Sequence, residues 1–403
     1  MKILFLSTWF PYPPNQGSKI RAYYLLKHLA EVHEVALVTF EDVELEPAWV
    51  EHIQQICPRL EIVRRKPFAA SKGKTWLGWL SPLPSAVVAI HSPEMAERVS
   101  QVAQSWKPDC VVALTFVTAP YALEVPGVPK VLDIDNFMAR MLQEAIPMAA
   151  NPAGRFRRWL AYRKFLAYER KLYPQFDLCL AVTESDRRLV TQQMPLKPDQ
   201  VIVVPNGVDT QYNHLELVKP VPDSLIFNGA MTYNANYDAV AYFLNEIFPT
   251  VRQQAPEARL RVTGSTKGVD LGALPLDGQV ELTGYLPDIR PAVAESWACV
   301  VPLRLGGGTR LKILEAMSLG TPVISTVKGA EGLEVEDGTD LLLAETPGEF
   351  AEQVLRVLRS AELRERLASS ASRLVADKYE WSRIGASFRH AVERLVLTKN
   401  ARK

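Results

Sequence analysis

Two successive series of short apolar runs, each alternating with helix-like stretches, constrain this chain more than any other feature of its sequence. In the first half, runs such as 3–7, 34–39 and 110–115 alternate with longer amphipathic stretches, and the same alternation restarts after a turn-rich segment. Continuous apolar runs of this length are typical of strands buried on both faces of a parallel sheet. The sequence therefore predicts an α/β protein with two α/β/α lobes.

The expected elements follow from this alternation. The predicted strands of the first half are 3–7, 34–39, 60–64, 110–115, 130–133, 178–182 and 201–204. Those of the second half are 225–228, 259–263, 280–283, 298–302, 323–325 and 340–343. The clearest helical stretches are 18–30, 92–105, 154–173 and 381–397.

The boundary between the lobes is predicted at Pro205-Asn206-Gly207, a turn signal followed by a polar, proline-bearing stretch. We expect an N-terminal lobe at 1–205, a linker at 206–222 and a C-terminal lobe at 223–380. Residues 381–403 are predicted to form a last helix, and periodicity leaves open whether it crosses back to the first lobe. At 403 residues the chain is long enough for two such cores.

Composition excludes several classes of protein. The net charge of +1 argues against a dedicated nucleic-acid binder, although residues 1–205 hold 24 Lys/Arg against 20 Asp/Glu. The four cysteines are far apart, which favours free buried thiols over disulfides. No apolar run approaches the roughly 20 residues that cross a bilayer. We expect a cytoplasmic protein, either free or peripheral to the inner face of the plasma membrane.

The segment 300–325 contains the strongest chemical signal. A buried strand is expected to end in Gly306-Gly307-Gly308, and a helix to begin near Thr309. Glycines let backbone N–H groups approach a ligand, and a helix N-terminus favours an anion. Arg310 and Lys312 add positive charge there, and Glu315 follows within reach of a sugar hydroxyl. This arrangement suits a nucleoside diphosphate.

The same segment resembles the donor-site signature of glycosyltransferase family 4, the retaining GT-B enzymes. Further segments match the family in order along most of the chain: 11–21, 205–209, 227–231, 262–264, 282–286 and 329–333. The resemblance implies two Rossmann-like lobes that face each other across a cleft, and transfer of a sugar from an NDP-sugar to a glycan or glycolipid acceptor. It also implies a place in surface polysaccharide biosynthesis.

On that resemblance the donor-binding residues are expected to be Gly17, Gly229, Met231, Gly284, Tyr285, Gly307, Gly308, Thr309, Arg310, Leu311, Lys312 and Glu315. Glu315 corresponds to the second Glu of the family's donor motif, which holds the donor ribose. Gly307 replaces the first Glu, which puts the identity of the sugar in doubt. The C-lobe Arg and Lys that many relatives use on the diphosphate are also missing, and Arg310 and Lys312 are proposed to replace them.

The acceptor side is expected to include Arg21, Asp135 and Asn136. Asp135 and Asn136, together with Arg310 and Lys312, are our catalytic candidates. Asp133-Ile134-Asp135 also resembles a metal-binding DxD, but a structural or acceptor-side role is favoured, and neither a metal nor a cofactor is predicted. The turn after the first strand carries Pro13-Pro14 where a dinucleotide fingerprint would need glycine.

Two other functions remain open. A non-hydrolysing nucleotide-sugar 2-epimerase shares the two-lobed fold and would act without an acceptor. With Gly307 in place of a sugar-contacting Glu, the chain could instead be a non-catalytic nucleotide-sugar-binding partner.

Two basic segments could contact an anionic membrane. Arg64–Leu80 holds five Lys/Arg and two tryptophans, and Gly154–Tyr173 holds seven Lys/Arg interleaved with aromatics. Basic charge mixed with aromatic side chains suits the headgroup zone of a membrane. The alternative for Gly154–Tyr173 is an amphipathic helix whose aromatics pack on its own sheet.

Overall fold

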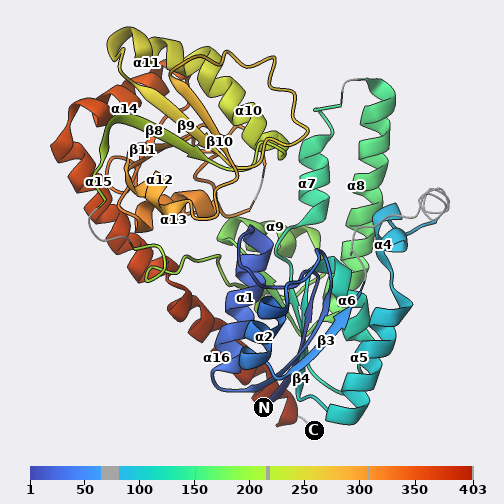
Figure 1. Cartoon of the computed structure of the whole chain (residues 1–403). Helices are drawn as coiled ribbons and strands as arrows, with labels where there is room; N and C mark the ends of the chain where they lie inside the picture. The colour runs from blue at the N-terminus through green and yellow to red at the C-terminus, as the bar shows by residue number, and fades with distance from the viewer. Residues whose placement is uncertain (65–80, 150, 215–217, 307, 402–403) are drawn as a thin grey trace. The chain divides into compact units, whose positions relative to one another are not determined.

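The computed structural model divides the chain into two units, each built around one parallel sheet (Figure 1). Unit 1 comprises Met1–Pro205 together with Ser382–Lys403, and unit 2 comprises Asn206–Trp381. The structure describes residues 1–64, 81–149, 151–214, 218–306 and 308–401. Gly307 and most of the predicted membrane segment Arg64–Leu80 lie outside the described residues.

The sheet of unit 1 has the strand order β3-β2-β1-β4-β5-β6-β7. Its strands are β1 (Lys2–Ser7), β2 (Glu34–Phe40), β3 (Arg59–Val63), β4 (Cys110–Leu114), β5 (Lys130–Asp133), β6 (Leu178–Ala181) and β7 (Val201–Val203). All neighbouring pairs are parallel. Strands are added in one direction from β1 to β3 and in the opposite direction from β4 to β7. A doubly wound sheet leaves a crevice at its carboxyl edge at this point of reversal, between β1 and β4.

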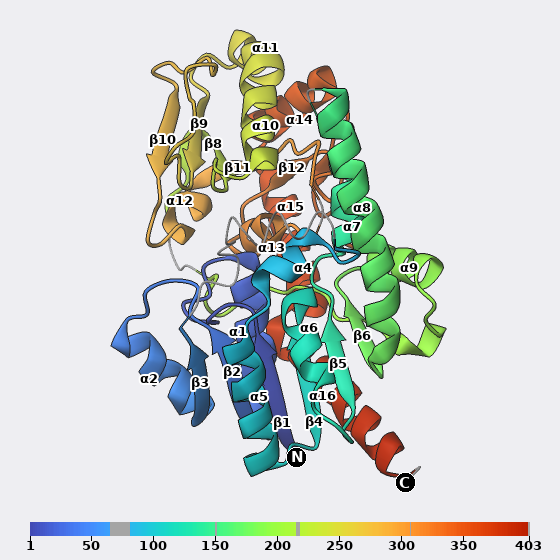
Figure 2. The ribbon, with the colours of Figure 1, turned by 90° about the vertical axis from the view of Figure 1, so that its right-hand side faces the viewer.

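Helices cover this sheet (Figure 2). They are α1 (Gly17–Ala30), α2 (Pro47–Ile56), α4 (Ser85–Ile90), α5 (Pro93–Trp106), α6 (Thr115–Leu123), α7 (Met138–Ala145), α8 (Pro152–Leu172), α9 (Glu184–Gln193) and α16 (Trp381–Asn400). One part of the core joins Leu4, Val38 and Val111 of the strands to Met95 and Val99 of α5.

The sheet of unit 2 has the order β10-β9-β8-β11-β12-β13, again all parallel. Its strands are β8 (Val221–Asn228), β9 (Arg259–Thr263), β10 (Val280–Gly284), β11 (Ser296–Val301), β12 (Val323–Ser325) and β13 (Leu342–Leu343). Its α-helices are α10 (Asn234–Tyr242), α11 (Phe248–Gln254), α12 (Arg290–Ala294), α13 (Leu311–Ser318), α14 (Pro347–Arg359) and α15 (Ala361–Leu374). The reversal of chain order falls between β8 and β11.

Three expectations can be compared with this architecture. Each unit is an α/β layer structure with a parallel sheet, which confirms the predicted fold class at the level of the single lobe. All four cysteines are free and buried, as expected, and burial raises the pKa of each thiol to about 12. The last helix, from Ser382 on, belongs to unit 1.

Candidate functional site

Five of the predicted donor residues, Gly229, Gly308, Arg310, Lys312 and Glu315, lie at the carboxyl edge of the unit 2 sheet, where chain order reverses between β8 and β11. The loop after β8 begins at Gly229, and the loop after β11 leads through Gly306 to α13. A reversal point leaves a crevice between the two departing loops, and ligands of open α/β sheets bind there. The local topology therefore selects the same residues as the sequence motif does.

Close backbone packing shapes this crevice. At Gly264, φ is +104°, and a Cβ atom would lie 2.6 Å from the carbonyl carbon of Gly229 and from the amide nitrogen of Ala230. A Cβ atom on Gly229 would lie 2.7 Å from both Lys312 Nζ and Asn236 Nδ2. Glycine at both positions therefore lets the loop after β8 approach the side chain of Lys312.

Lys312 lies in the first turn of α13 with its ammonium group turned toward β8 and α10. Its Nζ donates a hydrogen bond to Asn236 Oδ1 at 2.9 Å and lies 4.0 Å from the centroid of the Phe227 ring. Burial lowers the pKa of this ammonium group to about 7, and the nearby positive charge of Arg310 also lowers it. Among the residues that the structure describes, no carboxylate is hydrogen-bonded to Lys312, and a lysine with a pKa near 7 suits a site whose ligand brings negative charge.

Glu315 lies one turn further along α13 and belongs to the same cluster. Asn228 Nδ2 lies 3.5 Å from Glu315 Oε2, and the Cys299 thiol is 3.7 Å from Asn228 Oδ1. Burial raises the pKa of the Glu315 carboxyl, and the charge of Lys312 opposes that shift. The cluster thus combines a cation and a carboxyl group on one face of a single helix.

The turn before α13 has the left-handed backbone that glycine favours, with φ of +94° at Gly306 and +79° at Gly308. Arg310 is buried and donates from Nη2 to the Gly306 carbonyl at 2.7 Å. A Cβ atom on Gly306 would lie 3.0 Å from the Tyr233 hydroxyl, so the turn packs against the start of α10. Thr309 Oγ1 is buried and has no hydrogen-bond partner among the described residues.

Three other donor candidates of unit 2 lie away from this turn, and Gly17 lies in unit 1. Met231 follows Gly229, is 2 % exposed and donates its backbone N–H to the Ser265 carbonyl, so its side chain belongs to the core. Gly284 and Tyr285 lie at the end of edge strand β10, two strands away from β8. The Tyr285 side chain is 65 % exposed.

The acceptor-side candidates meet at the carboxyl edge of the unit 1 sheet. Arg21 of α1 donates to Asp133 at the end of β5 through Nε (2.8 Å) and Nη2 (2.6 Å). Both side chains are about 1 % exposed. This bidentate pair fixes α1 against β5, so the Arg21 guanidinium is occupied by the protein itself.

Asp135 has a strained backbone in the same region. Its φ is +44°, in the left-handed region that non-glycine residues seldom adopt. Its carboxylate accepts hydrogen bonds from Ser18 Oγ at 2.8 Å and from Asn136 Nδ2 at 3.1 Å. Burial and the neighbouring Asp133 raise the pKa of Asp135. Gly17 begins α1 next to Ser18 and is exposed, so the structure brings Gly17, Asp135 and Asn136 close together.

Sequence reasoning missed several contributors. Asn236 and Asn228 hold Lys312 and Glu315, but no pattern near either asparagine announces that role. Glu169 is the one acidic residue of the basic segment Gly154–Tyr173. It is fully buried and accepts the backbone N–H groups of Met138 and Ala139, both at 3.1 Å, at the start of α7. A lone acid in a basic helix was the only available signal.

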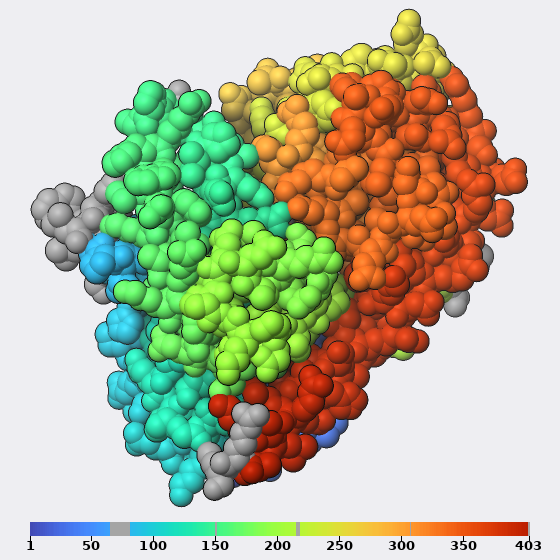
Figure 3. Space-filling view, turned by 180° about the vertical axis from the view of Figure 1, so that it is seen from behind, coloured from blue at the N-terminus to red at the C-terminus, as the bar shows by residue number. Residues whose placement is uncertain are grey.

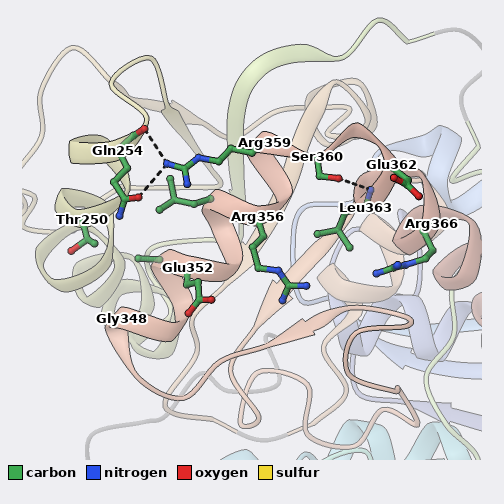
Figure 4. Close-up of a pocket in the computed structure, with 12 residues that line it drawn as sticks. Thr250, Gln254, Gly348, Glu352, Arg356, Arg359, Ser360, Glu362, Leu363 and Arg366 are labelled. Atoms are coloured by element: carbon green, nitrogen blue, oxygen red, sulfur yellow. Dashed lines mark hydrogen bonds between the residues drawn. The ribbon is translucent and has the colours of Figure 1, made fainter.

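The structure was also searched for metal-ion sites and for pockets. Among the described ranges, no group of three or more His, Cys, Asp or Glu side chains is placed to hold a metal ion. A hollow of about 750 Å³ is lined by α11, α14 and α15 and includes none of the predicted site residues (Figure 4). Its Arg359 donates to the backbone carbonyl and the side chain of Gln254.

Comparisons with known proteins identify the family of this chain. Residues 16–212 match the family described as Glycosyltransferase Family 4, and residues 222–360 match Glycosyl transferases group 1. The chain is 21 % identical over 402 residues to the uncharacterized 44.6 kDa protein in the cps region of Klebsiella pneumoniae, covering 96 % of this chain and 98 % of that one.

Solved structures show the same fold. Anabaena Alr3699/HepE in complex with UDP-glucose has a TM-score of 0.68 at 16 % identity, covering 98 % of this chain and 100 % of that one. WaaG, a glycosyltransferase involved in lipopolysaccharide biosynthesis, has a TM-score of 0.65 at 14 % identity, covering 97 % and 99 %. With both family models matched in chain order and GT-B glycosyltransferases as structural neighbours, this chain belongs to the group 1, family 4 glycosyltransferases and is a glycosyltransferase enzyme.

Proposed function

We propose that this enzyme transfers a sugar, with retention of anomeric configuration, from an NDP-sugar to a glycan or lipid-linked acceptor in surface polysaccharide biosynthesis. The observation that carries the proposal is the placement of the buried Lys312 and Glu315 side chains on one face of α13, at the β8–β11 reversal point. Uridine nucleotides are the first donors to test, because HepE was solved with UDP-glucose. The cps-region relative and WaaG support a polysaccharide or lipopolysaccharide type of acceptor.

Within unit 2, each group has a proposed role. Lys312, Arg310 and the amides of the glycine turn stabilise the diphosphate, whose negative charge grows as the sugar departs. Glu315 accepts hydrogen bonds from the ribose hydroxyls. Lys312 enters the complex as a cation, since a diphosphate beside it reverses the effect of burial on its pKa.

In the proposed reaction, the bond between the anomeric carbon and the diphosphate oxygen breaks while the acceptor oxygen bonds to that carbon on the same face. The acceptor proton passes to the leaving phosphate oxygen. Asp135 and Asn136 are proposed to orient the acceptor, and Arg21 holds the strand from which they project. NMR of the product tests the stereochemistry, and an inverted anomeric centre would contradict a retaining mechanism.

The donor site itself is tested by thermal-shift and calorimetric titration with UDP-, GDP- and ADP-sugars. Wild type is compared with Glu315→Ala, Lys312→Met and the control Glu334→Ala, which removes a carboxylate from the exposed surface of unit 2. A bound donor should raise Tm by mass action, and only the first two variants should lose that rise. If no nucleotide sugar shifts the wild type, or Glu315→Ala responds like wild type, the proposed donor site is wrong.

The partner and location of the enzyme complete the proposal. Within the described part of the chain, no helix combines the length and apolar character needed to span a membrane. We place the enzyme in the cytoplasm, with peripheral contact to the inner face of the plasma membrane. Of the two basic segments that suggested this contact, Gly154–Tyr173 is the one that the structure describes.

A further inference from the structure

We propose that the outer face of α8 docks the protein on an anionic lipid surface. The docking face, which we call the α8 stripe, consists of Arg155, Phe156, Trp159 and Arg163. Trp159 lies four residues after Arg155 and three after Phe156, and Arg163 lies four residues after Trp159, spacings that place side chains on one side of a helix. The stripe lies within unit 1 and uses none of the residues assigned to nucleotide-sugar binding.

The two aromatic side chains of the stripe are exposed and touch each other. Phe156 is 60 % exposed and Trp159 is 44 % exposed. Their rings stack with centroids 5.8 Å apart and an interplanar angle of 27°. Large apolar side chains paired on a helix surface are what an interfacial helix inserts among lipid headgroups.

Positive charge accompanies these rings on the same face. The Arg163 guanidinium lies 5.8 Å from the centroid of the Trp159 ring, which places cation and aromatic on one side of α8. Arg155 and Arg157 are also exposed. The only acid of α8 is Glu169, which is fully buried and bonded to α7, so no exposed carboxylate of this helix opposes an anionic surface.

Two other basic residues of α8 donate hydrogen bonds to backbone carbonyls of unit 1. Arg158 donates to the Ala145 carbonyl at 2.5 Å, at the end of α7, and Lys164 donates to the Ser81 carbonyl at 2.9 Å. These contacts hold α8 to its own unit. The seven basic residues noted in the sequence therefore divide into anchors that face the protein and a set that faces outward.

The neighbouring connection extends the apolar character of this region. The loop that joins α7 to α8 exposes Met148 (47 %), and α7 exposes Met141 (37 %). Figure 1 shows α7 and α8 running side by side beyond the strands of unit 1, and part of the surface of α8 is among the green atoms of Figure 3. Exposed apolar side chains among arginines match an anionic membrane, which supplies both phosphates and an apolar boundary.

The test is flotation of the purified full-length protein with vesicles of phosphatidylglycerol and phosphatidylcholine, compared with phosphatidylcholine alone. Wild type should float with the anionic vesicles and lose binding at high salt. Phe156→Ser/Trp159→Ser and Arg155→Glu/Arg163→Glu should each weaken binding by about tenfold or more. The matched controls are Leu397→Ser on α16 and Arg366→Glu on α15, both exposed, and these should bind like wild type.

Folding and donor binding are measured on the same samples through Tm and through the shift produced by UDP-sugar. A stripe variant that keeps the wild-type Tm and the wild-type response to UDP-sugar, but no longer floats with the vesicles, supports the proposal independently of the glycosyltransfer chemistry. Equal flotation of stripe and control variants, or absence of flotation in wild type, would overturn it. So would concentration-dependent dimerisation that the stripe substitutions abolish, because the face would then bind a second copy.

Discussion

Lys312 is the residue whose charge state should respond most directly to a bound diphosphate. Its pKa is lowered to about 7 in the free protein, and a diphosphate beside it favours the protonated form. Affinity for UDP should therefore fall as pH rises from 7 to 9, by at most about tenfold per pH unit. Calorimetry in buffers of different ionisation enthalpy should show proton uptake on binding.

Lys312→Arg provides the control for this pH dependence. A guanidinium remains charged throughout the range, so the variant should bind UDP with an affinity that changes little between pH 7 and 9. Binding by wild type that is equally flat would show that Lys312 does not meet the diphosphate. Without ligand, the unfolded chain binds a proton at Lys312 that the folded chain lacks between pH 7 and about 10, so this group makes the free energy of unfolding rise with pH there.

Gly264 offers a test of the close packing that forms the crevice. Gly264→Ala must hold an L side chain at φ +104° and place its Cβ 2.6 Å from the backbone of Gly229 and Ala230. We expect a loss of about 1–3 kcal/mol of unfolding free energy and weaker UDP binding. Gly278→Ala is the control, because a Cβ atom there meets nothing within 4 Å. Chemical denaturation measures the unfolding free energy of the two variants. Equal stability of Gly264→Ala and Gly278→Ala would contradict the close packing at Gly264.

At the scale of elements, α7 depends on a residue that lies far along the chain. Glu169 accepts two backbone N–H groups at the start of α7 and the Tyr173 hydroxyl at 2.8 Å. Burial raises the pKa of this carboxyl to about 7, above its unfolded value of 4.5. The folded protein therefore binds the extra proton between pH 4.5 and 7, and the stability from this group is lost as pH rises through that window.

Glu169→Gln removes the titration while keeping the shape of the side chain. The difference in unfolding free energy between wild type and variant should shrink as pH rises from about 4.5 to 7, by at most about 3 kcal/mol. Denaturation at a series of pH values measures it. Glu144→Gln on α7, which removes the carboxylate that pairs with Arg140, is the control. A constant difference across the window would mean that Glu169 titrates normally.

The elements also show what the sequence can and cannot predict. Strands buried on both faces are continuous apolar runs, so every predicted strand is present, and 130–133, 259–263 and 323–325 match at both ends. Strand ends depend on tertiary contacts. Thr115 was expected to end β4 but begins α6 with φ +66°, where its hydroxyl meets that of Thr8 at 2.9 Å.

The same limit applies to the candidate site. Arg310, Lys312 and Glu315 share one motif with recognisable spacing, so the sequence alone selects them. Asn236 and Asn228 come from other elements and are joined to that motif only by folding. Helix α7 was missed because its stabilising acid, Glu169, lies about thirty residues away, where no local capping pattern reveals it.

At the scale of the whole molecule, the chain begins and ends in the same unit. After unit 2 the chain returns to unit 1 as α16, whose Phe388 and Val392 are fully buried. The contact is tight: a Cβ atom on Gly385 would lie 2.2 Å from the His28 ring of α1. Lys399 pairs with Asp177 of the same unit. The stability of unit 1 should therefore depend on α16, a helix that follows unit 2 in the sequence.

Phe388→Ala tests this dependence. Loss of a buried aromatic side chain should cost about 3–5 kcal/mol. Because α16 belongs to unit 1, hydrogen exchange should accelerate in β1 and β2 but not in β8 and β11 of unit 2. Leu397→Ala on the same helix removes a side chain that is 68 % exposed and should leave exchange unchanged in both units. If protection falls equally in both sheets, the two units unfold as one cooperative body, and α16 stabilises the whole chain rather than unit 1 alone.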